Sequence, residues 1–385
     1  MRIGFDGKRA VQNFTGLGNY SRYVADILCH FYPENDYVLY APKKRENKRM
    51  NLLTGQYRQL TLAYPATFFW KKLSSLWRVW GITSQLEKEG IELFHGLSNE
   101  LPLNIHKSRI KSIVTIHDLI FLRYPQYYQS IDRKIYTYKF RKACENADKI
   151  IAISECTKRD ITRYFNIPDD KIEVVYQGCD VSFTHPVTEE KKEEVRKKYQ
   201  LPDHYILNVG SIEERKNILA AVQALPMLPQ HIHIVIVGRR TGYTKKVEQF
   251  IKDNGLGERV HIISNVPFND LPAFYQSAEI FVYPSRFEGF GIPIIEALYS
   301  GIPVVAAAYR KRKRSAVSCL EEAGGPDSIY VNPDDITGLA DAFKQIYSNS
   351  DKRKNMVEKG REFAKRFSEK QQSEEIINIY KKLIR

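Results

Sequence analysis

The stretch from Phe281 to Val305 limits most strongly what this chain can fold into, because a strand, a loop, a helix and a second strand follow one another within it. Residues 280–283 (Ile-Phe-Val-Tyr) are β-branched and aromatic and are stopped by a proline, which predicts a buried strand. Pro293 suits the first turn of a helix that Gly301 ends, and residues 302–305 begin the next strand.

The loop and the helix start within this stretch predict an anion site. A glycine at 289 lets the backbone pass close to a bound group, and the free N–H groups of the helix start point outward. Such N–H groups bind a phosphate without a positive side chain. The residues concerned run from Phe290 through Gly291 and Ile292 to Ile294.

Two carboxylates flank the predicted anion site, Glu288 in the loop and Glu296 near the first turn of the helix. Carboxylates do not bind an anion but accept hydrogen bonds from hydroxyl groups. We therefore expect Glu288 and Glu296 to accept hydrogen bonds from sugar hydroxyls, one at the reacting sugar and one at a ribose. The alternative is that Glu288 is a solvated loop residue and that Glu296 caps the helix and interacts favourably with its dipole.

Strands and helices alternate through the second half of the chain, which predicts a doubly wound parallel sheet. The first strand of this half, residues 205–209, leads into Gly210 and Ser211 and then Arg215 and Lys216, before a helix over 218–225. At that position both cations can reach a bound diphosphate.

The first half predicts a similar sheet with strands at residues 2–5, 37–40, 91–95 and 113–116. His95 and His117 lie at the carboxyl ends of two of these strands, where open α/β sheets bind their ligands. Asp118 is placed to orient His117, and His95 is an acceptor-side candidate. Gly16 and Gly18, ahead of a predicted helix over 20–31, can bring N–H groups to a diphosphate.

Several of these segments resemble one family. The segment PSRFEGFGIPIIEALYSGIPVVA is similar to the donor-site signature of the retaining family-4 glycosyltransferases, which have the GT-B fold. The pattern G-x-x-x-x-R-K-N over 210–217 matches the same family, as do HDLIFLRYP and ADKIIAISECTKRDI in the first half. The resemblance implies two Rossmann-like domains facing each other across a cleft, with His117 near the donor sugar and Val266 against the nucleotide base.

The implied domains follow from length and pattern. A chain of 385 residues suits two cores, with an acceptor-side domain over 1–180, a linker over 181–203 and a nucleotide-sugar domain over 204–365. A helix over 366–385 is expected to cross back to the first domain, as it does in this fold.

The resemblance implies transfer of a sugar from a nucleotide-diphosphate donor, with retained configuration, to a hydroxyl of a saccharide acceptor that is lipid-linked. The pattern looks most like bacterial mannosyltransferases of surface polysaccharide assembly, which implies GDP-mannose, with a UDP-sugar as the other donor. No Asp-x-Asp occurs, so we expect no cofactor and no metal, with Arg215 and Lys216 supplying the positive charge. A nucleotide-sugar epimerase of the same fold and a non-catalytic polyanion-binding protein remain alternatives.

The charge is +14 overall, and residues 1–180 carry 28 Lys and Arg against 19 Asp and Glu, which leaves +9 in the first half. No nucleic-acid motif accompanies the charge. Residues 67–82, which hold all three tryptophans among lysines and an arginine, fit either an anionic membrane surface or packing on the first core. No apolar run spans a membrane and the five cysteines form no pattern, so we expect a cytoplasmic protein, peripheral at the inner membrane face.

The chain departs from the family after Val305. Five consecutive basic residues, from Arg310 to Arg314, precede the segment that contains Glu322. A run of like charges repels itself, so we expect a mobile loop, with added phosphate contacts as the alternative.

Overall fold

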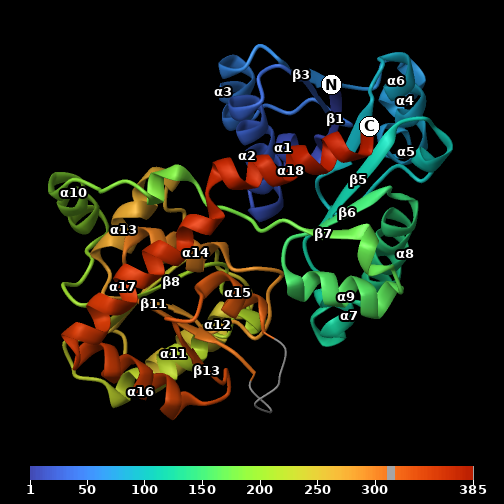
Figure 1. Ribbon diagram of the computed structural model, residues 1–385. Helices are drawn as coiled ribbons and strands as arrows, with labels where there is room; N and C mark the ends of the chain where they lie inside the picture. Colours follow the sequence, from blue (N-terminus) through green and yellow to red (C-terminus); the bar gives the residue numbers. More distant parts are fainter. Residues whose placement is uncertain (310–316, 385) are drawn as a thin grey trace. The chain divides into compact units, whose positions relative to one another are not determined.

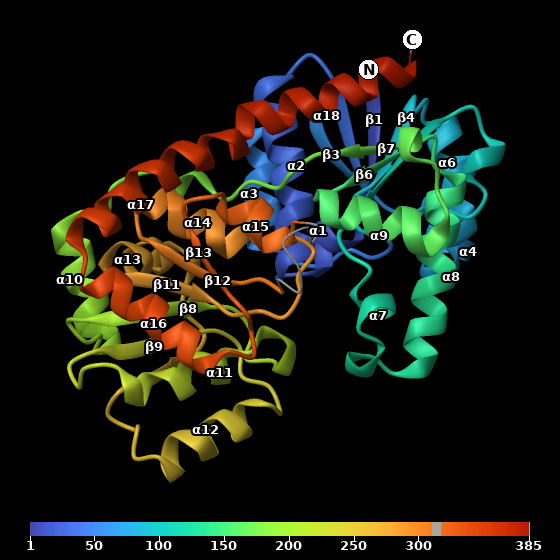
Figure 2. The same ribbon diagram turned by 60° about the horizontal axis from the view of Figure 1, so that its bottom comes forward.

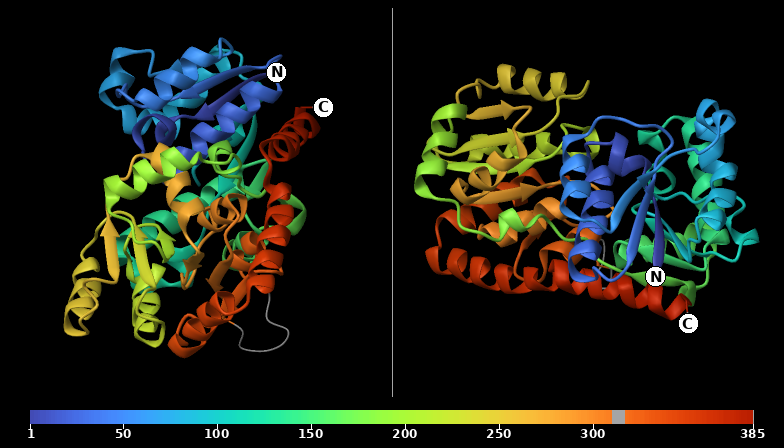
Figure 3. Two further views of the ribbon diagram at one scale, coloured as in Figure 1. Left: turned by 90° about the vertical axis from the view of Figure 1, so that its left-hand side faces the viewer. Right: turned by 90° about the horizontal axis from the view of Figure 1, so that it is seen from above.

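The computed structural model describes residues 1–309 and 317–384, which form two compact units (Figure 1). Unit 1 comprises Met1–Gln177 and Ser368–Arg385, and unit 2 comprises Gly178–Phe367. Each unit contains one parallel sheet, and Figure 3 shows the strands of each unit side by side with helices packed around them. The chain therefore has the two parallel-sheet Rossmann-like domains that the sequence predicts.

Unit 1 has a seven-stranded sheet in the order β3-β2-β1-β4-β5-β6-β7. Its strands are β1 (Arg2–Asp6), β2 (Asp36–Tyr40), β3 (Leu60–Ala63), β4 (Leu93–Gly96), β5 (Lys111–Ile116), β6 (Lys149–Ala152) and β7 (Ile172–Val174). Its main helices are α1 (Lys8–Gln12), α2 (Gly16–Phe31), α3 (Lys48–Gln56), α4 (Phe68–Lys72), α5 (Ser74–Leu76), the π-helix η1 (Trp77–Gly81), α6 (Ile82–Lys88), α7 (Ile120–Arg123), α8 (Ser130–Asn146), α9 (Glu155–Phe165) and α18 (Glu369–Ile384).

Both faces of this sheet are covered. Ile113 and Val114 are neighbours in β5, and their side chains enter two different buried clusters because successive strand residues point to opposite faces. The last helix supplies Ile376, Ile377 and Tyr380 to the first cluster, and α18 lies along α2 in Figure 2.

Unit 2 has a six-stranded sheet in the order β10-β9-β8-β11-β12-β13. Its strands are β8 (Tyr205–Val209), β9 (His233–Val237), β10 (Val260–Ile263), β11 (Ile280–Tyr283), β12 (Val304–Ala307) and β13 (Ile329–Val331). Its main helices are α10 (Glu189–Tyr199), α11 (Ile218–Ala224), α12 (Thr244–Asp253), α13 (Leu271–Ser277), α14 (Ile292–Ser300), α15 (Cys319–Gly324), α16 (Ile336–Tyr347) and α17 (Ser350–Ala364).

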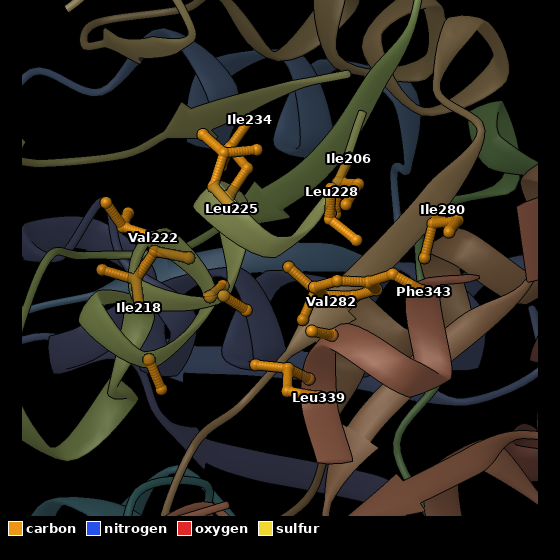
Figure 4. Packing of buried hydrophobic residues seen from close by; sticks show 14 of the residues in the cluster. Ile206, Ile218, Val222, Leu225, Leu228, Ile234, Ile280, Val282, Leu339 and Phe343 are labelled. Carbon is orange, nitrogen blue, oxygen red and sulfur yellow. The ribbon is translucent and has the colours of Figure 1, made fainter. Parts of the chain in front are cut away.

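The core of unit 2 joins two helices to the central strands. Ile218 and Val222 of α11 and Leu339 and Phe343 of α16 point into one buried cluster, which Figure 4 shows from close by. This packing fixes the start of α11, and with it the loop that precedes it.

The segment expected to be a linker, residues 181–203, belongs to unit 2. Its helix α10 packs against α13, and Lys191 and Lys198 form ion pairs of 3.0 and 2.7 Å with the buried Asp270. The chain passes from unit 1 to unit 2 after Gln177 and returns at Ser368.

Two helix starts in unit 1 are set by local structure. Helix α3 begins at Lys48 because the Asn47 side chain accepts hydrogen bonds from the Arg49 and Met50 N–H groups. The helix expected from Tyr20 begins at Gly16, so both glycines of the predicted diphosphate loop lie in its first turn. Among the described residues, no helix has the length and apolar character needed to cross a membrane.

Candidate functional site

The strongest candidate site in unit 2 is an ion cluster at the carboxyl ends of β8 and β11. The carboxylate of Glu288 lies 2.8 Å from Nη1 of Arg215 and 3.1 Å from Nζ of Lys216. Two hydroxyls also donate to Oε1 of Glu288, that of Ser285 at 2.7 Å and that of Tyr283 at 3.2 Å. Three of the predicted residues, Glu288, Arg215 and Lys216, are thus brought together.

Mutual attraction keeps this cluster charged although it is nearly buried. Burial opposes ionisation of Glu288, but Lys216 and Arg215 outweigh it and lower the pKa of the carboxyl to about 2. Burial likewise opposes the Lys216 charge, and Glu288 raises the pKa of that ammonium above its usual value. Both cations lie against the Glu288 carboxylate, and Arg215 also lies 3.8 Å from the more exposed Glu213. Arginine and lysine side chains held in this way are suited to contact a phosphate group.

Local backbone structure positions the two cations. Arg215 and Lys216 lie in a short 3₁₀ turn over Glu214–Lys216, and Asn217 follows in the left-handed conformation (φ 56°). The buried side-chain amide of Asn217 donates to the carbonyl oxygens of Pro284 and Pro333, at 3.3 and 2.8 Å. The turn after β8 is therefore fastened to the loop after β11, which carries Glu288.

Gly210 lies at the point where two strand ends approach closely. Its φ of 152° disfavours other residues, and its carbonyl oxygen is 1.8 Å from where a Cβ on Gly238, at the end of β9, would lie. Ser211 donates to Oε1 of Glu213 at 2.6 Å. Val266 follows β10 in a neighbouring loop, where Ser264 donates to the Gly238 carbonyl oxygen at 2.7 Å.

The start of α14 offers fewer N–H groups to an anion than the sequence predicted. The Ile294 N–H donates to the Gly291 carbonyl oxygen at 2.9 Å, so it is used inside the helix. Phe290 is buried with its ring against Phe367, and a Cβ on Gly291 would lie 3.0 Å from that of Ala323. The Ile294 N–H is therefore not available to an anion at this helix start.

Glu296 lies in α14, outside the ion cluster around Glu288. The Tyr275 hydroxyl donates to Oε2 of Glu296 at 2.6 Å. Burial and the negative charge of Asp180 together outweigh this hydrogen bond and raise the pKa of the Glu296 carboxyl to about 7. The carboxyl is thus poised between its neutral and ionised forms near neutral pH.

In unit 1, His117 lies at the carboxyl end of β5 as predicted. One ring nitrogen, Nε2, is 2.9 Å from the Leu97 carbonyl oxygen, and Nδ1 is 3.1 Å from the amide nitrogen of Gln177. Burial is the main cause that lowers the pKa of His117 to about 4, so the ring is neutral. Asp118 accepts from the Ile120 N–H at 3.1 Å at the start of α7, and the ring of His117 is oriented by Leu97 and Gln177 instead.

His95, the acceptor-side candidate, is enclosed in the core of unit 1. Its side chain has no exposed surface, and its two ring nitrogens lie 2.6 Å from the Tyr380 hydroxyl and 2.8 Å from the Thr115 hydroxyl. Burial lowers its pKa to about 3. This arrangement favours a structural role, in which His95 joins β4 to α18.

Gly18 is required by packing. Its N–H donates to the Thr15 carbonyl oxygen at 2.9 Å, so it is used within the first turn of α2. A Cβ at this position would lie 2.0 Å from the Asn13 carbonyl oxygen, whereas a Cβ on Gly16 would meet nothing within 4 Å.

Sequence reasoning missed several members of the unit 2 site. Tyr283 ends β11 and contacts both Glu288 and Lys216, and its place at a strand end is a signal that could have found it. Cys319, at the start of α15, donates to the Glu288 carbonyl oxygen at 2.8 Å, across a sequence distance that hides the contact. Glu322 is buried in the same short helix. The basic run Arg310 to Arg314 lies outside the described residues.

Two family models together match most of the chain. The model described as "Glycosyltransferase Family 4" matches residues 21–183, and the model described as "Glycosyl transferases group 1" matches residues 189–363. These ranges fall on unit 1 and unit 2 respectively.

Bacterial mannosyltransferases are among the relatives that the chain matches. The chain is 30% identical to O-antigen chain mannosyltransferase B of Escherichia coli over 76% of this chain and 74% of that one. It is 28% identical to O-antigen chain mannosyltransferase RfbU of Salmonella typhimurium over 60% of each chain. It also matches the serotype-specific mannosyltransferase WbdA of Escherichia coli, of which it spans only 31%.

Solved structures share the fold across the full length. Sucrose-phosphate synthase of Thermosynechococcus elongatus is 19% identical with a TM-score of 0.76, covering 100% of this chain and 99% of that chain. HepE of Anabaena, in complex with UDP, is 17% identical with a TM-score of 0.77, covering 100% of both. With two parallel-sheet domains, an Arg-Lys-Glu cluster at the strand ends and these relatives, the chain belongs to the glycosyltransferases of group 1 and family 4, and has the GT-B fold.

Proposed function

We propose that the protein transfers mannose from GDP-mannose, with retained anomeric configuration, to a hydroxyl of a lipid-linked saccharide in surface polysaccharide synthesis. The use of a nucleotide-diphosphate donor is supported by the cluster of Arg215 and Lys216 around Glu288 at the strand ends of unit 2. The choice of mannose as the transferred sugar is supported by the relatives, two of which are O-antigen chain mannosyltransferases.

The chemical demand of this reaction fits the cluster. Breaking the bond to a nucleoside diphosphate places growing negative charge on the phosphate, and Arg215 and Lys216 are already held in place to stabilise it. Removing one such positioned donor typically costs about 3 kcal/mol of transition-state stabilisation. The proposal therefore assigns the two cations the role of a metal ion, and it expects full activity in the presence of a chelator.

The two glutamates take different parts in this proposal. Glu288 holds the transferred sugar and keeps the cations in place. Glu296 accepts hydrogen bonds from the ribose hydroxyls, which favour the ionised carboxylate. In the ligand-free protein, burial favours the neutral acid, and the hydrogen bond from Tyr275 favours the ionised form. His117, being neutral, contributes a polar contact to the donor sugar without adding charge.

A UDP-sugar is the second candidate donor, because HepE, which shares the fold, is also seen in complex with UDP-glucose. Thermal stabilisation of the full chain by GDP, UDP, ADP and their sugars separates these donors. A nucleotide at one hundred times its dissociation constant adds about 2.7 kcal/mol to folding stability. We expect GDP and GDP-mannose to raise the midpoint most, and the Arg215→Gln/Lys216→Gln variant to lose that shift.

Transfer itself requires a second readout. Release of GDP from GDP-mannose should increase when lipid-linked saccharide is added, with mannose appearing in the lipid fraction. Release of free nucleotide at the same rate without any acceptor would contradict the transferase proposal and favour an epimerase.

The proposal also includes contact with an anionic membrane surface through unit 1. Trp70 packs over Gly81 and Trp77 is fully buried, so these two tryptophans belong to the core. Five other apolar side chains of this segment are exposed: Phe68 (73%), Phe69 (60%), Leu73 (39%), Leu76 (43%) and Trp80 (48%). With Lys71 and Lys72 among them, they fit a surface that inserts rings beneath anionic headgroups.

A further inference from the structure

A group of charged side chains gathers at the carboxyl end of β1 in unit 1, outside the site already described. Asp6 is the last residue of β1, and Lys8 and Arg9 open α1 directly after it. Arg78 of η1 and Glu100, in the loop after β4, reach the same place. In parallel α/β sheets, ligands bind at this end of the strands.

The two carboxylates of this group are already occupied. Nη2 of Arg78 is 2.5 Å from Oδ2 of Asp6, and Nη1 is 2.6 Å from Oε2 of Glu100. Lys139 of α8 adds a second cation 3.6 Å from the Glu100 carboxylate. Asp6 and Glu100 are therefore the counter-ions of Arg78 and Lys139, which balances those four charges.

Lys8 and Arg9 remain without a counter-ion in the part of the chain that the structure describes. Both are half-buried, and no carboxylate lies within 4.0 Å of either side-chain cation among the described ion pairs. Burial is the largest cause that lowers the pKa of the Lys8 ammonium, and the charges of Arg78 and Arg9 lower it further. Glu100 and Asp6 act in the opposite direction, but they do not offset this lowering. An arrangement of this kind costs folding stability, and an anion placed beside the two side chains would remove the cost.

The pair also adjoins the predicted catalytic end of unit 1. The charge of Arg9 acts on the buried His117 and helps to keep its ring neutral. An anion held by Lys8 and Arg9 would thus lie at the same end of the unit 1 sheet as His117.

We infer that the acceptor carries a phosphate or a carboxylate group, and that Lys8 and Arg9 bind it at the carboxyl end of β1. The inference rests on the proposed function in one respect, namely that unit 1 holds the acceptor. Arg78 pairs directly with Asp6 and Glu100, and among the described residues neither carboxylate forms an ion pair with Lys8 or Arg9. An uncharged saccharide would leave the two cations without a partner.

Equilibrium dialysis of the full chain with radiolabelled pyrophosphate tests the inference. Wild type should bind two pyrophosphates per chain, one at Lys8 and Arg9 and one at Arg215 and Lys216. Lys8→Gln/Arg9→Gln should lose the first site and Arg215→Gln/Lys216→Gln the second, each by at least about tenfold in affinity. The swap Lys8→Arg/Arg9→Lys, which keeps both charges, should retain two sites.

A matched control separates a specific site from general charge. Lys88→Gln/Lys382→Gln removes two exposed lysines from the same unit and should keep both sites. Equal weakening in this control and in the Lys8/Arg9 variant would overturn the inference, as would two full sites in the Lys8/Arg9 variant. If the Arg215/Lys216 variant binds two pyrophosphates and the Lys8/Arg9 variant binds one, the donor site of the proposed function is contradicted, whereas the unit 1 site is supported.

A second probe identifies the source of the anion. Glucuronate that binds wild type and the swap variant, but not Lys8→Gln/Arg9→Gln, would show that the site accepts a sugar carboxylate. If pyrophosphate binds at Lys8 and Arg9 but glucuronate does not, the site is specific for phosphate groups. Binding of neither probe at Lys8 and Arg9 would overturn the inference.

Discussion

At the scale of single residues, Glu296 shows a conflict between stability and function. Its folded pKa of about 7 lies above the usual value of 4.5, so the ionised form is disfavoured in the fold. Folding stability is therefore undiminished below pH 4.5 and decreases as the pH rises through 7, by about 3 kcal/mol in total. In the proposed function, this cost keeps an ionisable carboxylate available to a ribose.

Glu296→Gln should consequently stabilise the ligand-free protein and weaken its binding of nucleotide. The amide keeps an acceptor for the Tyr275 hydroxyl and removes the buried charge. We expect an increase of about 1–3 kcal/mol in the free energy of unfolding at pH 8 and almost none at pH 4. Nucleotide affinity at pH 8 should decrease about tenfold or more. A variant that binds nucleotide as wild type does would remove Glu296 from the donor site.

Glu288 shows the opposite pH dependence. Its folded pKa of about 2 lies below 4.5, so the stability it contributes is present above pH 4.5 and is lost as the pH falls towards 2. Glu288→Gln leaves Arg215 and Lys216 without their carboxylate, which should reduce the free energy of unfolding by about 3 kcal/mol at pH 7. Chemical denaturation at pH 7 and pH 3 measures this, and the difference should shrink at the lower pH.

Glu213→Gln is the matched control for that variant. Glu213 lies 3.8 Å from Arg215 and is more exposed than Glu288, so its loss should cost less than about 1 kcal/mol. Equal effects of the two substitutions would show that the ion cluster has no special role in stability.

At the scale of helices, two exposed apolar rows in unit 1 compete as membrane contacts. The first row is Phe68, Phe69, Leu73, Leu76 and Trp80, and the second is Ile131, Ile135 and Tyr138 on α8. Phe68→Ser/Phe69→Ser should reduce binding to anionic vesicles about tenfold or more, because each buried ring contributes about 1.5–3 kcal/mol. Ile131→Ser/Ile135→Ser should bind as wild type does in the same sedimentation assay. The reverse result would assign the membrane contact to α8.

The same scale shows how much of the fold the sequence predicts. Strands such as 205–209 and 280–283 are buried on both faces, so they appear as continuous apolar runs, and they were predicted correctly. The edge strands β3 (Leu-Thr-Leu-Ala) and β13, which has three residues, were missed because they are short and partly exposed. The pairing of Glu288 with both Arg215 and Lys216 was also missed, since it depends on contacts between distant parts of the chain, with Lys216 and Glu288 72 residues apart.

At the scale of the whole molecule, unit 1 is made from both ends of the chain. Ile376, Ile377 and Tyr380 of α18 are buried in a cluster with β1, β2 and α2, and Tyr380 contacts Nδ1 of His95. Unit 1 therefore cannot complete its core until the last helix has been made. Unit 2, residues 178–367, contains its own sheet and cores and has no such dependence.

Weakening α18 should accordingly destabilise one unit and spare the other. Ile376→Ala/Ile377→Ala removes apolar volume from the unit 1 core, at a cost of about 2–5 kcal/mol for each substitution. Native-state hydrogen exchange should then show faster exchange in β1, β4 and α2, with β8 and β11 unchanged, because units with separate cores can open independently. Tyr380→Phe, which removes only the contact with His95, should produce a smaller effect of about 1 kcal/mol in the same strands. Equal acceleration in β8 and β11 would instead show that the two units unfold as one cooperative body, so that the integrity of the donor cluster depends on the last helix of the chain.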